Sequence, residues 1–239
     1  QLMTDKRLRG RIALVTGASR GIGRAVARRF AAEGASLILV ARTSGGLEEA
    51  DDDVRSAGGE PAMLVPLDIC QGNLVDQLGA ALHERFGRLD ILVGNAAMLG
   101  GLRPVGHYPP DVWEDVIALN LTANWRLIRS LDPLLRLSDA GRAMFVTSGV
   151  TEGTPPAYWG AYTASKAALE ALVRTYAAEL KRTNLKVNII DPGASATNMR
   201  AEAFPGEDPN TLATPDEITE RFVELAEASY GESGAKLFV

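Results

Sequence analysis

Short apolar runs recur along the chain and alternate with longer segments in which apolar residues return every three or four positions. The runs are rich in Val, Ile and Leu and lack the alternating polar residues of a half-exposed strand, which is typical of strands buried on both faces. Strand alternating with helix seven times predicts an α/β fold, a seven-stranded parallel, doubly wound sheet with helices on both faces. The predicted strands are 11–16, 36–41, 62–68, 90–95, 143–148, 186–191 and 236–239.

Three of the intervening segments carry a clear helical period. One begins near Ile22, a second runs from Val112 to about Leu131, and the third spans 161–180. The third helix is apolar around more of its circumference than packing on one face of a sheet requires. This predicts a second apolar neighbour, plausibly a partner subunit.

Composition narrows the classes of function. No linker or repeat divides the chain, so residues 1–239 are expected to form one domain. A net charge of -5 argues against a general nucleic-acid binder, because no basic stripe is present to neutralise phosphates. One cysteine, Cys70, and two histidines leave no disulfide and no metal site. No apolar run approaches the length of a membrane span and no signal-like segment is found, so we expect a cytoplasmic protein without a membrane partner.

The stretch TGASRGIG, residues 16–23, follows the first predicted strand and leads into the first helix. Its glycines are Gly17, Gly21 and Gly23, in the order G-x-x-x-G-x-G. Glycine lets the backbone turn sharply and approach a ligand closely, and a helix N-terminus favours phosphate. The stretch therefore predicts a nucleotide-binding loop, although glycines alone would also suit a plain strand–helix turn.

Tyr162 and Lys166 lie four residues apart in the third helix, hence on one face and one turn apart. A phenol ordinarily has a pKa of about 10, and a nearby ammonium favours the phenolate and lowers that pKa. The pair is then a usable acid or base. A structural tyrosine beside a surface lysine is the alternative that this spacing alone leaves open.

Taken with further landmarks, the chain resembles the short-chain dehydrogenase/reductase family along nearly its whole length. The landmarks are the glycine order, Asp68 after the third strand, the NAA of residues 95–97, Asn120 in a long helix, Ser148 after the fifth strand, YTASK with Tyr162 and Lys166, and PGASAT after the sixth strand. The 3-oxoacyl-(acyl carrier protein) reductase-like and carbonyl reductase-like branches look nearest. The resemblance implies a single-domain Rossmann fold with a substrate loop at about 193–215.

The resemblance also implies the roles of four catalytic residues. Tyr162 would exchange a proton with the carbonyl or alcohol oxygen, and Ser148 would hydrogen-bond that oxygen. Lys166 would lower the pKa of Tyr162 and hold the nicotinamide ribose, and Asn120 would organise a water relay behind Lys166. The implied cofactor contacts are Gly17, Ser19, Arg20, Gly21, Ile22, Gly23, Arg42, Thr43, Asp68, Ile69, Asn95, Ala96, Ala97, Tyr162, Lys166, Pro192, Gly193, Ser195 and Thr197.

The residues after the second strand indicate which dinucleotide is bound. NAD-specific members carry an acidic residue there to hold the ribose 2′-hydroxyl. Here the position holds Ala41, followed by Arg42, while Arg20 lies inside the glycine loop. Guanidinium groups pair with phosphate oxygens, so we expect NADP(H), with NAD(H) as the less favoured alternative.

Two positions depart from the family pattern. Ala97 replaces the usual glycine of N-A-G, a small change unless the backbone there needs a positive φ. Ser148 precedes Tyr162 by one position more than usual, and the usual offset falls on Gly149. We prefer Ser148, because the strand end FVTS fits and the loop between can absorb one residue.

The expected function is NADP(H)-dependent interconversion of a carbonyl and a secondary alcohol. The partner is a small carbonyl or alcohol, with an acyl thioester as one option, and the expected assembly is a homodimer or homotetramer. The alternative is a non-catalytic NADP(H)-binding sensor on the same fold, which would have no need of Ser148, Tyr162 and Lys166 together.

Overall fold

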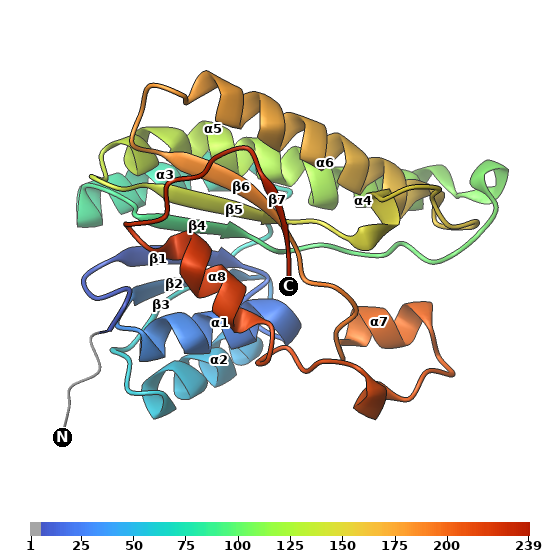
Figure 1. The fold of residues 1–239 in the computed structure, drawn as a ribbon, viewed down its shortest axis with the longest axis horizontal. Coiled ribbons are helices and arrows are strands. Elements are labelled where there is room, and N and C mark those ends of the chain that lie inside the picture. The colour runs from blue at the N-terminus through green and yellow to red at the C-terminus, as the bar shows by residue number, and fades with distance from the viewer. Residues whose placement is uncertain (1–5) are drawn as a thin grey trace.

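A seven-stranded parallel sheet forms the centre of the computed structural model, which describes residues 6–239 (Figure 1). The strand order is β3-β2-β1-β4-β5-β6-β7. The bounds are β1 Ile12–Thr16, β2 Ser36–Ala41, β3 Met63–Pro66, β4 Ile91–Gly94, β5 Arg142–Val146, β6 Lys186–Asp191 and β7 Lys236–Phe238. The predicted fold class is confirmed, and each strand boundary lies within two residues of the predicted one.

Helices cover both faces of this sheet (Figure 1). One face carries α1, α2 and α8, and the other carries α3, α5 and α6, as the two main apolar clusters show. The bounds are α1 Gly21–Ala32, α2 Ser44–Ser56, α3 Gly72–Phe86, α4 Pro110–Ile117, α5 Ala123–Arg136, α6 Gly160–Glu179, α7 Asn198–Ala203 and α8 Thr219–Ala226.

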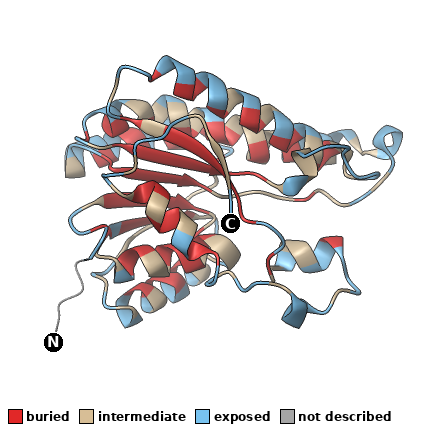
Figure 2. Ribbon diagram, viewed as in Figure 1, coloured by how far each residue is buried: buried red, intermediate tan, exposed pale blue. Residues whose placement is uncertain are grey.

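The strands are continuously apolar because alternate side chains enter two different cores. In β1, Leu14 packs into the cluster under α3, α5 and α6, while its neighbour Val15 packs into the cluster under α1, α2 and α8. Figure 2 shows the central strands as buried along their length. A polar side chain at Ala13, Leu14 or Val15 would be fully buried, and without a hydrogen-bond partner it would destabilise the fold.

Strand order reverses at the centre of the sheet, because β1 pairs with β2 on one side and with β4 on the other. Connections from β1 and β4 leave for opposite faces, which opens a crevice at the carboxyl ends of the strands. The loops that follow β1, β4, β5 and β6 therefore converge at one edge of the sheet.

Two segments differ from the prediction. The expected helix from Val112 to Leu131 is α4 and α5 joined by a turn of π-helix at Ala118–Thr122. The expected loop 193–215 contains α7 and a short 3₁₀ turn at Pro209–Thr211. Apolar periodicity does not mark a short helix with few buried residues. Among the residues that the structure describes, no helix is both long and apolar enough to span a membrane.

Candidate active site

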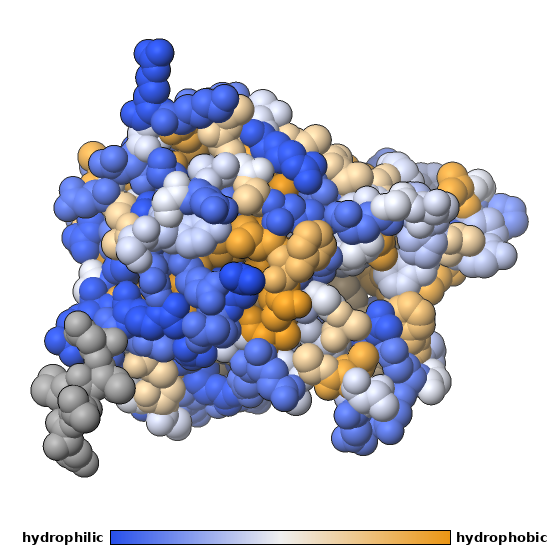
Figure 3. Space-filling view, viewed as in Figure 1, coloured by the Kyte–Doolittle hydropathy of each residue, from blue (hydrophilic) through white to orange (hydrophobic). Residues whose placement is uncertain are grey.

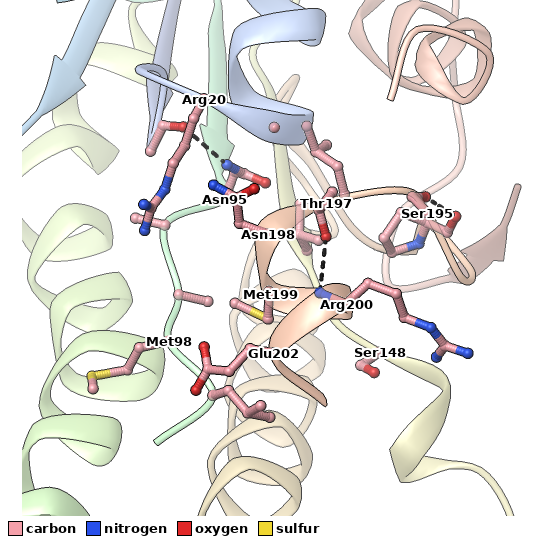
Figure 4. A pocket seen from close by; sticks show the side chains of 18 of the residues that line it. Arg20, Asn95, Met98, Ser148, Ser195, Thr197, Asn198, Met199, Arg200 and Glu202 are labelled. Carbon is pink, nitrogen blue, oxygen red and sulfur yellow. Dashed lines mark hydrogen bonds between the residues drawn. The ribbon is translucent and has the colours of Figure 1, made fainter. Parts of the chain in front are cut away.

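A cleft of about 1690 Å³ opens at the carboxyl ends of the strands. Figure 4 shows its lining, with Arg20 on one side and Ser148 together with Met199 and Glu202 of α7 farther along. Nearly all the residues expected to bind the cofactor or to react line it. The exceptions are Gly23 and Asn120, which lie behind the lining.

The backbone conformation of the glycine loop leaves the start of α1 exposed to this cleft. Gly17 and Gly21 have φ of +63° and +53°, conformations that favour glycine. A Cβ on Gly23 would lie 2.2 Å from the Gly17 carbonyl oxygen and 2.7 Å from Asn95 Nδ2, so no side chain fits there. No side chain of the described residues caps the start of α1, whose N–H groups remain available to an anion.

The loop after β4 is tied to the glycine loop through Thr16. The backbone N–H groups of Asn95 and Ala96 donate to Thr16 Oγ1 at 3.0 and 3.1 Å, and Asn95 Nδ2 donates to the Thr16 carbonyl at 3.2 Å. The next residue, Ala97, has a negative φ. Among the described residues other than glycine, Tyr158 is the one with a positive φ. The methyl group of Ala97 is therefore compatible with its backbone.

Four arginines line the cleft near the glycine loop and differ in how they are paired. Arg24 binds Glu49 and Asp53, and Arg28 pairs with Asp216. Arg20 and Arg42 are exposed and have no ion pair within residues 6–239. Two guanidinium groups with unused donors suit a dianionic group such as a phosphate.

Tyr162 and Lys166 lie on one face of α6, at the opposite side of the cleft, and are 6% and 2% exposed. Lys166 Nζ donates to the Val146 carbonyl at 2.9 Å and lies 5.7 Å from the centre of the Tyr162 ring. Burial raises the pKa of Tyr162 to about 12; a hydrogen bond with the Ser148 side chain opposes this rise, and the charge of Asp191 adds to it. Burial lowers the pKa of Lys166 to about 8, against the charge of Glu170.

A net lowering of the Tyr162 pKa is not seen, because burial dominates that pKa and Lys166 is not among the groups that shift it; the effect of Lys166 on the phenolate stays a prediction. The ring is buried and its phenolate would lose hydration, which outweighs the opposing effect of the Ser148 hydrogen bond. Asp191, at the end of β6, was missed from the sequence. An acidic residue at the carboxyl end of a predicted strand, directly before PGASAT, was the signal that could have found it.

Ser148 follows β5 and, despite the extra residue between them, lies close enough to Tyr162 for its side chain to oppose the rise in the tyrosine pKa. The intervening loop includes Tyr158, whose φ is +73°. The Tyr158 carbonyl accepts hydrogen bonds from Arg103 N at 3.0 Å and Tyr108 Oη at 3.1 Å, which hold this uncommon conformation. The loop thus accommodates its length without moving Ser148 away from α6.

Asn120 occupies the π-helical turn and is fully buried. Its Nδ2 donates to the Met98 carbonyl at 2.9 Å and to Ser165 Oγ at 3.0 Å, while its Oδ1 accepts from Met98 N at 2.9 Å. A π-turn re-aims one side chain within a helix. Here it joins the loop after β4 to the α6 turn that carries Lys166.

An apolar wall stands beside Tyr162. The Trp159 ring lies 5.9 Å from the Tyr162 ring and 5.7 Å from that of Phe204, which follows α7. The Arg200 guanidinium stacks 3.9 Å from the Phe204 ring centre and pairs with Glu207. Phe204 was not singled out from the sequence, because no periodicity surrounds it in the segment 193–215. Figure 3 shows the molecule hollowed between its main body and the lobe that carries α7.

Comparison with known proteins agrees with this geometry. Residues 11–208 match the family model described as short chain dehydrogenase. An uncharacterised oxidoreductase of Escherichia coli K12, YciK, is 40% identical over 91% of this chain and 86% of its own length. An uncharacterised NAD-dependent oxidoreductase of Mycobacterium tuberculosis, MT0715, is 35% identical over 92% of this chain and 90% of its own.

Among solved structures, a short chain dehydrogenase from Escherichia coli CFT073 complexed with NADPH is 37% identical. It superimposes with a TM-score of 0.93, over 98% of each chain. A family match across most of the chain, relatives above 30% identity and an open cradle at the glycine loop all agree. The chain belongs to the short-chain dehydrogenase/reductase family of NAD(P)-dependent oxidoreductases.

Proposed function

We propose that this protein interconverts a carbonyl and a secondary alcohol by NADP(H)-dependent hydride transfer, with Tyr162 as the general acid or base. The observation that carries the proposal is the group of half-buried Ser148 with buried Tyr162 and Lys166 at one end of a cleft whose other end holds two arginines that have no ion pair among the described residues. Buried titratable groups with shifted pKa values that share a cleft are typical of a reaction centre.

The Tyr162 hydroxyl donates its proton to the carbonyl oxygen during reduction, while the Ser148 hydroxyl hydrogen-bonds the same oxygen. With a pKa of about 12, Tyr162 stays protonated at neutral pH, so it is ready to donate. The nicotinamide, when bound, supplies the hydride. The Lys166 ammonium offsets negative charge as the phenolate forms. This protonation state favours reduction as the working direction.

The cofactor is held by the two sides of the cleft already described. The pyrophosphate would lie over the N-terminus of α1, where Gly17 and Gly23 let the glycine loop pack closely against Asn95. Arg20 and Arg42 would pair with the 2′-phosphate of NADP(H). Asp68 and Ile69 would border adenine, Asn95–Ala97 would lie beneath the cofactor, and Pro192, Gly193, Ser195 and Thr197 would border the nicotinamide. An NAD-dependent relative keeps NAD(H) as the alternative.

The substrate end of the cleft has an apolar group of side chains beside the charged Arg200 and Glu202. It is lined by Met98, Leu99, Trp159, Met199 and Phe204, with Tyr162 at its base. An apolar lining around one reacting oxygen favours a carbonyl with a hydrophobic body, and a medium-chain acyl thioester satisfies the same requirement.

The test is NADPH consumption against hydrophobic ketones, aldehydes and acetoacetyl thioesters, with Tyr162→Phe as the matched control. We expect turnover by the parent protein on at least one carbonyl and almost none by the variant. NADPH binding with no turnover of any compound would favour a non-catalytic sensor instead. Equal KM values for NADPH and NADH would contradict the assignment of Arg20 and Arg42.

We also propose a homodimer or homotetramer that buries the outer face of α6. Ala164, Ala167 and Ala171 are exposed there, and Ala168 and Leu172 are half-buried. Small apolar side chains let two helices approach closely, and exposed apolar stripes mark association sites. A monomer at all concentrations in analytical ultracentrifugation would contradict this proposal.

A further inference from the structure

Glu170 is a buried carboxylate that the proposed reaction does not use. It lies on α6 one turn beyond Lys166 and is 5% exposed. Removing a carboxylate from water is strongly unfavourable unless hydrogen bonds or an opposite charge compensate. Its partners therefore indicate what it is for.

Three donors converge on one carboxylate oxygen, Glu170 Oε1. The hydroxyls of Thr147 and Thr151 donate to it at 2.5 and 2.6 Å, and Lys236 Nζ donates at 2.9 Å. The two threonines lie on either side of Ser148 along the chain. Glu170 thus binds the backbone segment that carries Ser148 at two points, Thr147 before the serine and Thr151 after it.

Lys236 brings the last strand into the same group. Its side chain is 7% exposed, and its ammonium also donates to Thr151 Oγ1 at 2.8 Å and pairs with Glu152. The carboxylate therefore connects α6, the segment after β5 and the start of β7. Arg174 approaches the second oxygen, Glu170 Oε2, at 3.5 Å.

This arrangement keeps Glu170 ionised. Burial opposes the charge, but hydrogen bonds from Thr147, Thr151 and Lys236 outweigh it and leave the pKa of Glu170 below its ordinary value. An ionised carboxylate accepts strong, short hydrogen bonds from hydroxyl groups. The segment is therefore held by charge-assisted bonds rather than by ordinary ones.

Ser148 needs such an anchor. Tyr162 is fixed by α6, whereas Ser148 lies past the end of β5 and begins a single 3₁₀ turn, Gly149–Thr151. Within its own segment, the Ser148 side chain accepts only a long bond of 3.5 Å from Val150 N. The loop that follows is one residue longer than the family pattern and contains the left-handed Tyr158. The chain between Ser148 and Tyr162 cannot by itself set the distance between them.

We infer that Glu170 is a positioning residue that holds Ser148 opposite Tyr162, with Lys236 as its counterion. The inference rests on the proposed function, because the position of Ser148 matters to a reaction at Tyr162. Glu170 does not line the cleft, so it would act through Ser148. A carboxylate with only a structural role would contribute to stability, but its removal would not change how Ser148 supports turnover.

A double-mutant cycle tests the link. We expect Ser148→Ala to lower kcat about 100-fold, as loss of an oxyanion donor does. Glu170→Ala should lower kcat about 10-fold when Ser148 is present and less than about 2-fold when it is absent, because a positioning residue has nothing left to position. KM for NADPH should stay unchanged, and Glu170→Gln, which retains an acceptor oxygen, should lose less than Glu170→Ala.

Asp90 provides the matched control. It is also buried and accepts from three donors: Ile12 N at 2.8 Å, Ser138 Oγ at 2.6 Å and Arg88 Nε at 3.1 Å. It directly precedes β4, at the amino-terminal ends of the strands, on the side of the sheet away from the cleft. Asp90→Ala should lower the melting temperature at least as much as Glu170→Ala, leave kcat within about 2-fold, and combine additively with Ser148→Ala.

Amide hydrogen exchange gives a readout that does not depend on turnover. Glu170→Ala should raise exchange in residues 147–152 selectively, and Asp90→Ala should not. Unchanged exchange there, or equal losses of kcat with and without Ser148, overturns the inference. An unaffected Ser148→Ala enzyme, or no turnover of any carbonyl, instead counts against the proposed function. Whichever of these two results is found, faster amide exchange of residues 147–152 in Glu170→Ala still shows that Glu170 holds this segment in place.

Discussion

The two ends of the cleft hold their charges in opposite ways. At the end near the glycine loop, Arg20 and Arg42 are exposed, carry no ion pair among the described residues and lie on the loops that follow β1 and β2. At the end near α6, Tyr162, Lys166 and Glu170 are buried, and Lys166 and Glu170 are each hydrogen-bonded to a group from another element. Exposed donors recognise an incoming anion, whereas buried groups have their proton affinities set by the fold before any ligand arrives.

The difference teaches where substitutions should act. Removing a charge from the exposed end changes binding, because water replaces the lost partner. Changing a group at the buried end alters proton affinity or geometry, because no water can replace it. Substitutions at the exposed end should therefore change cofactor affinity, and substitutions at the buried end should change turnover.

The largest expected effect comes from Tyr162→Phe, which removes the proton donor while retaining the ring and its contact with Trp159. We expect kcat to fall about 1000-fold, within the range for loss of a general acid. The dissociation constant for NADPH, measured by calorimetry, should change little. A variant that keeps one-tenth of the parent activity would contradict the assignment of Tyr162.

At the exposed end, the double variant Arg20→Ala/Arg42→Ala should raise KM for NADPH about 100-fold, because two charge-assisted contacts with the 2′-phosphate are lost. KM for NADH and kcat should remain near the parent values. Arg129→Ala, which removes an exposed arginine paired with Asp76 on the outer surface, is the matched control and should change neither KM. Equal losses with both dinucleotides would remove the basis for an NADP(H) preference.

The pH profile distinguishes the two titrating groups of the buried end. Below a pH of about 8 Lys166 carries its charge, and above that pH it becomes neutral. Tyr162, with a pKa of about 12, stays protonated throughout this interval. The reductive kcat/KM should therefore be flat at lower pH and fall above pH 8, by about tenfold per unit if only the charged lysine supports reaction. A profile that stays flat to strongly alkaline pH would exclude Lys166 as the controlling group.

The smallest effect is expected for Ala97→Gly, which restores the residue usual in the family. The backbone at Ala97 does not require a positive φ, so its methyl group imposes no strain. We expect kcat and KM for NADPH to change by less than about 2-fold and stability to fall slightly, because glycine increases the entropy of the unfolded chain. A large gain in activity would show that the methyl group obstructs the cofactor.

Much of the fold could be predicted because its causes are local. Buried strands impose continuous apolar runs, and the seven runs mark all seven strands. The break of the helix after Ile117 could not be predicted, because the π-turn satisfies Asn120 by bonds to Met98 and Ser165, residues of other elements. In the same way, α7 could not be predicted, because a helix of six residues is too short to show apolar periodicity.

The sequence by itself determined the order of the elements, the glycine loop at a helix start, the absence of an acidic residue after β2 and the placement of Tyr162 and Lys166 on one helical face. Each of these follows from backbone geometry within a few residues. Only the tertiary structure decided that Ser148 faces Tyr162 across a longer loop, that burial raises the pKa of the tyrosine, and that Glu170 binds both flanks of Ser148. Hydrogen bonding between distant residues and removal of water from them exist only once the chain has closed around the site.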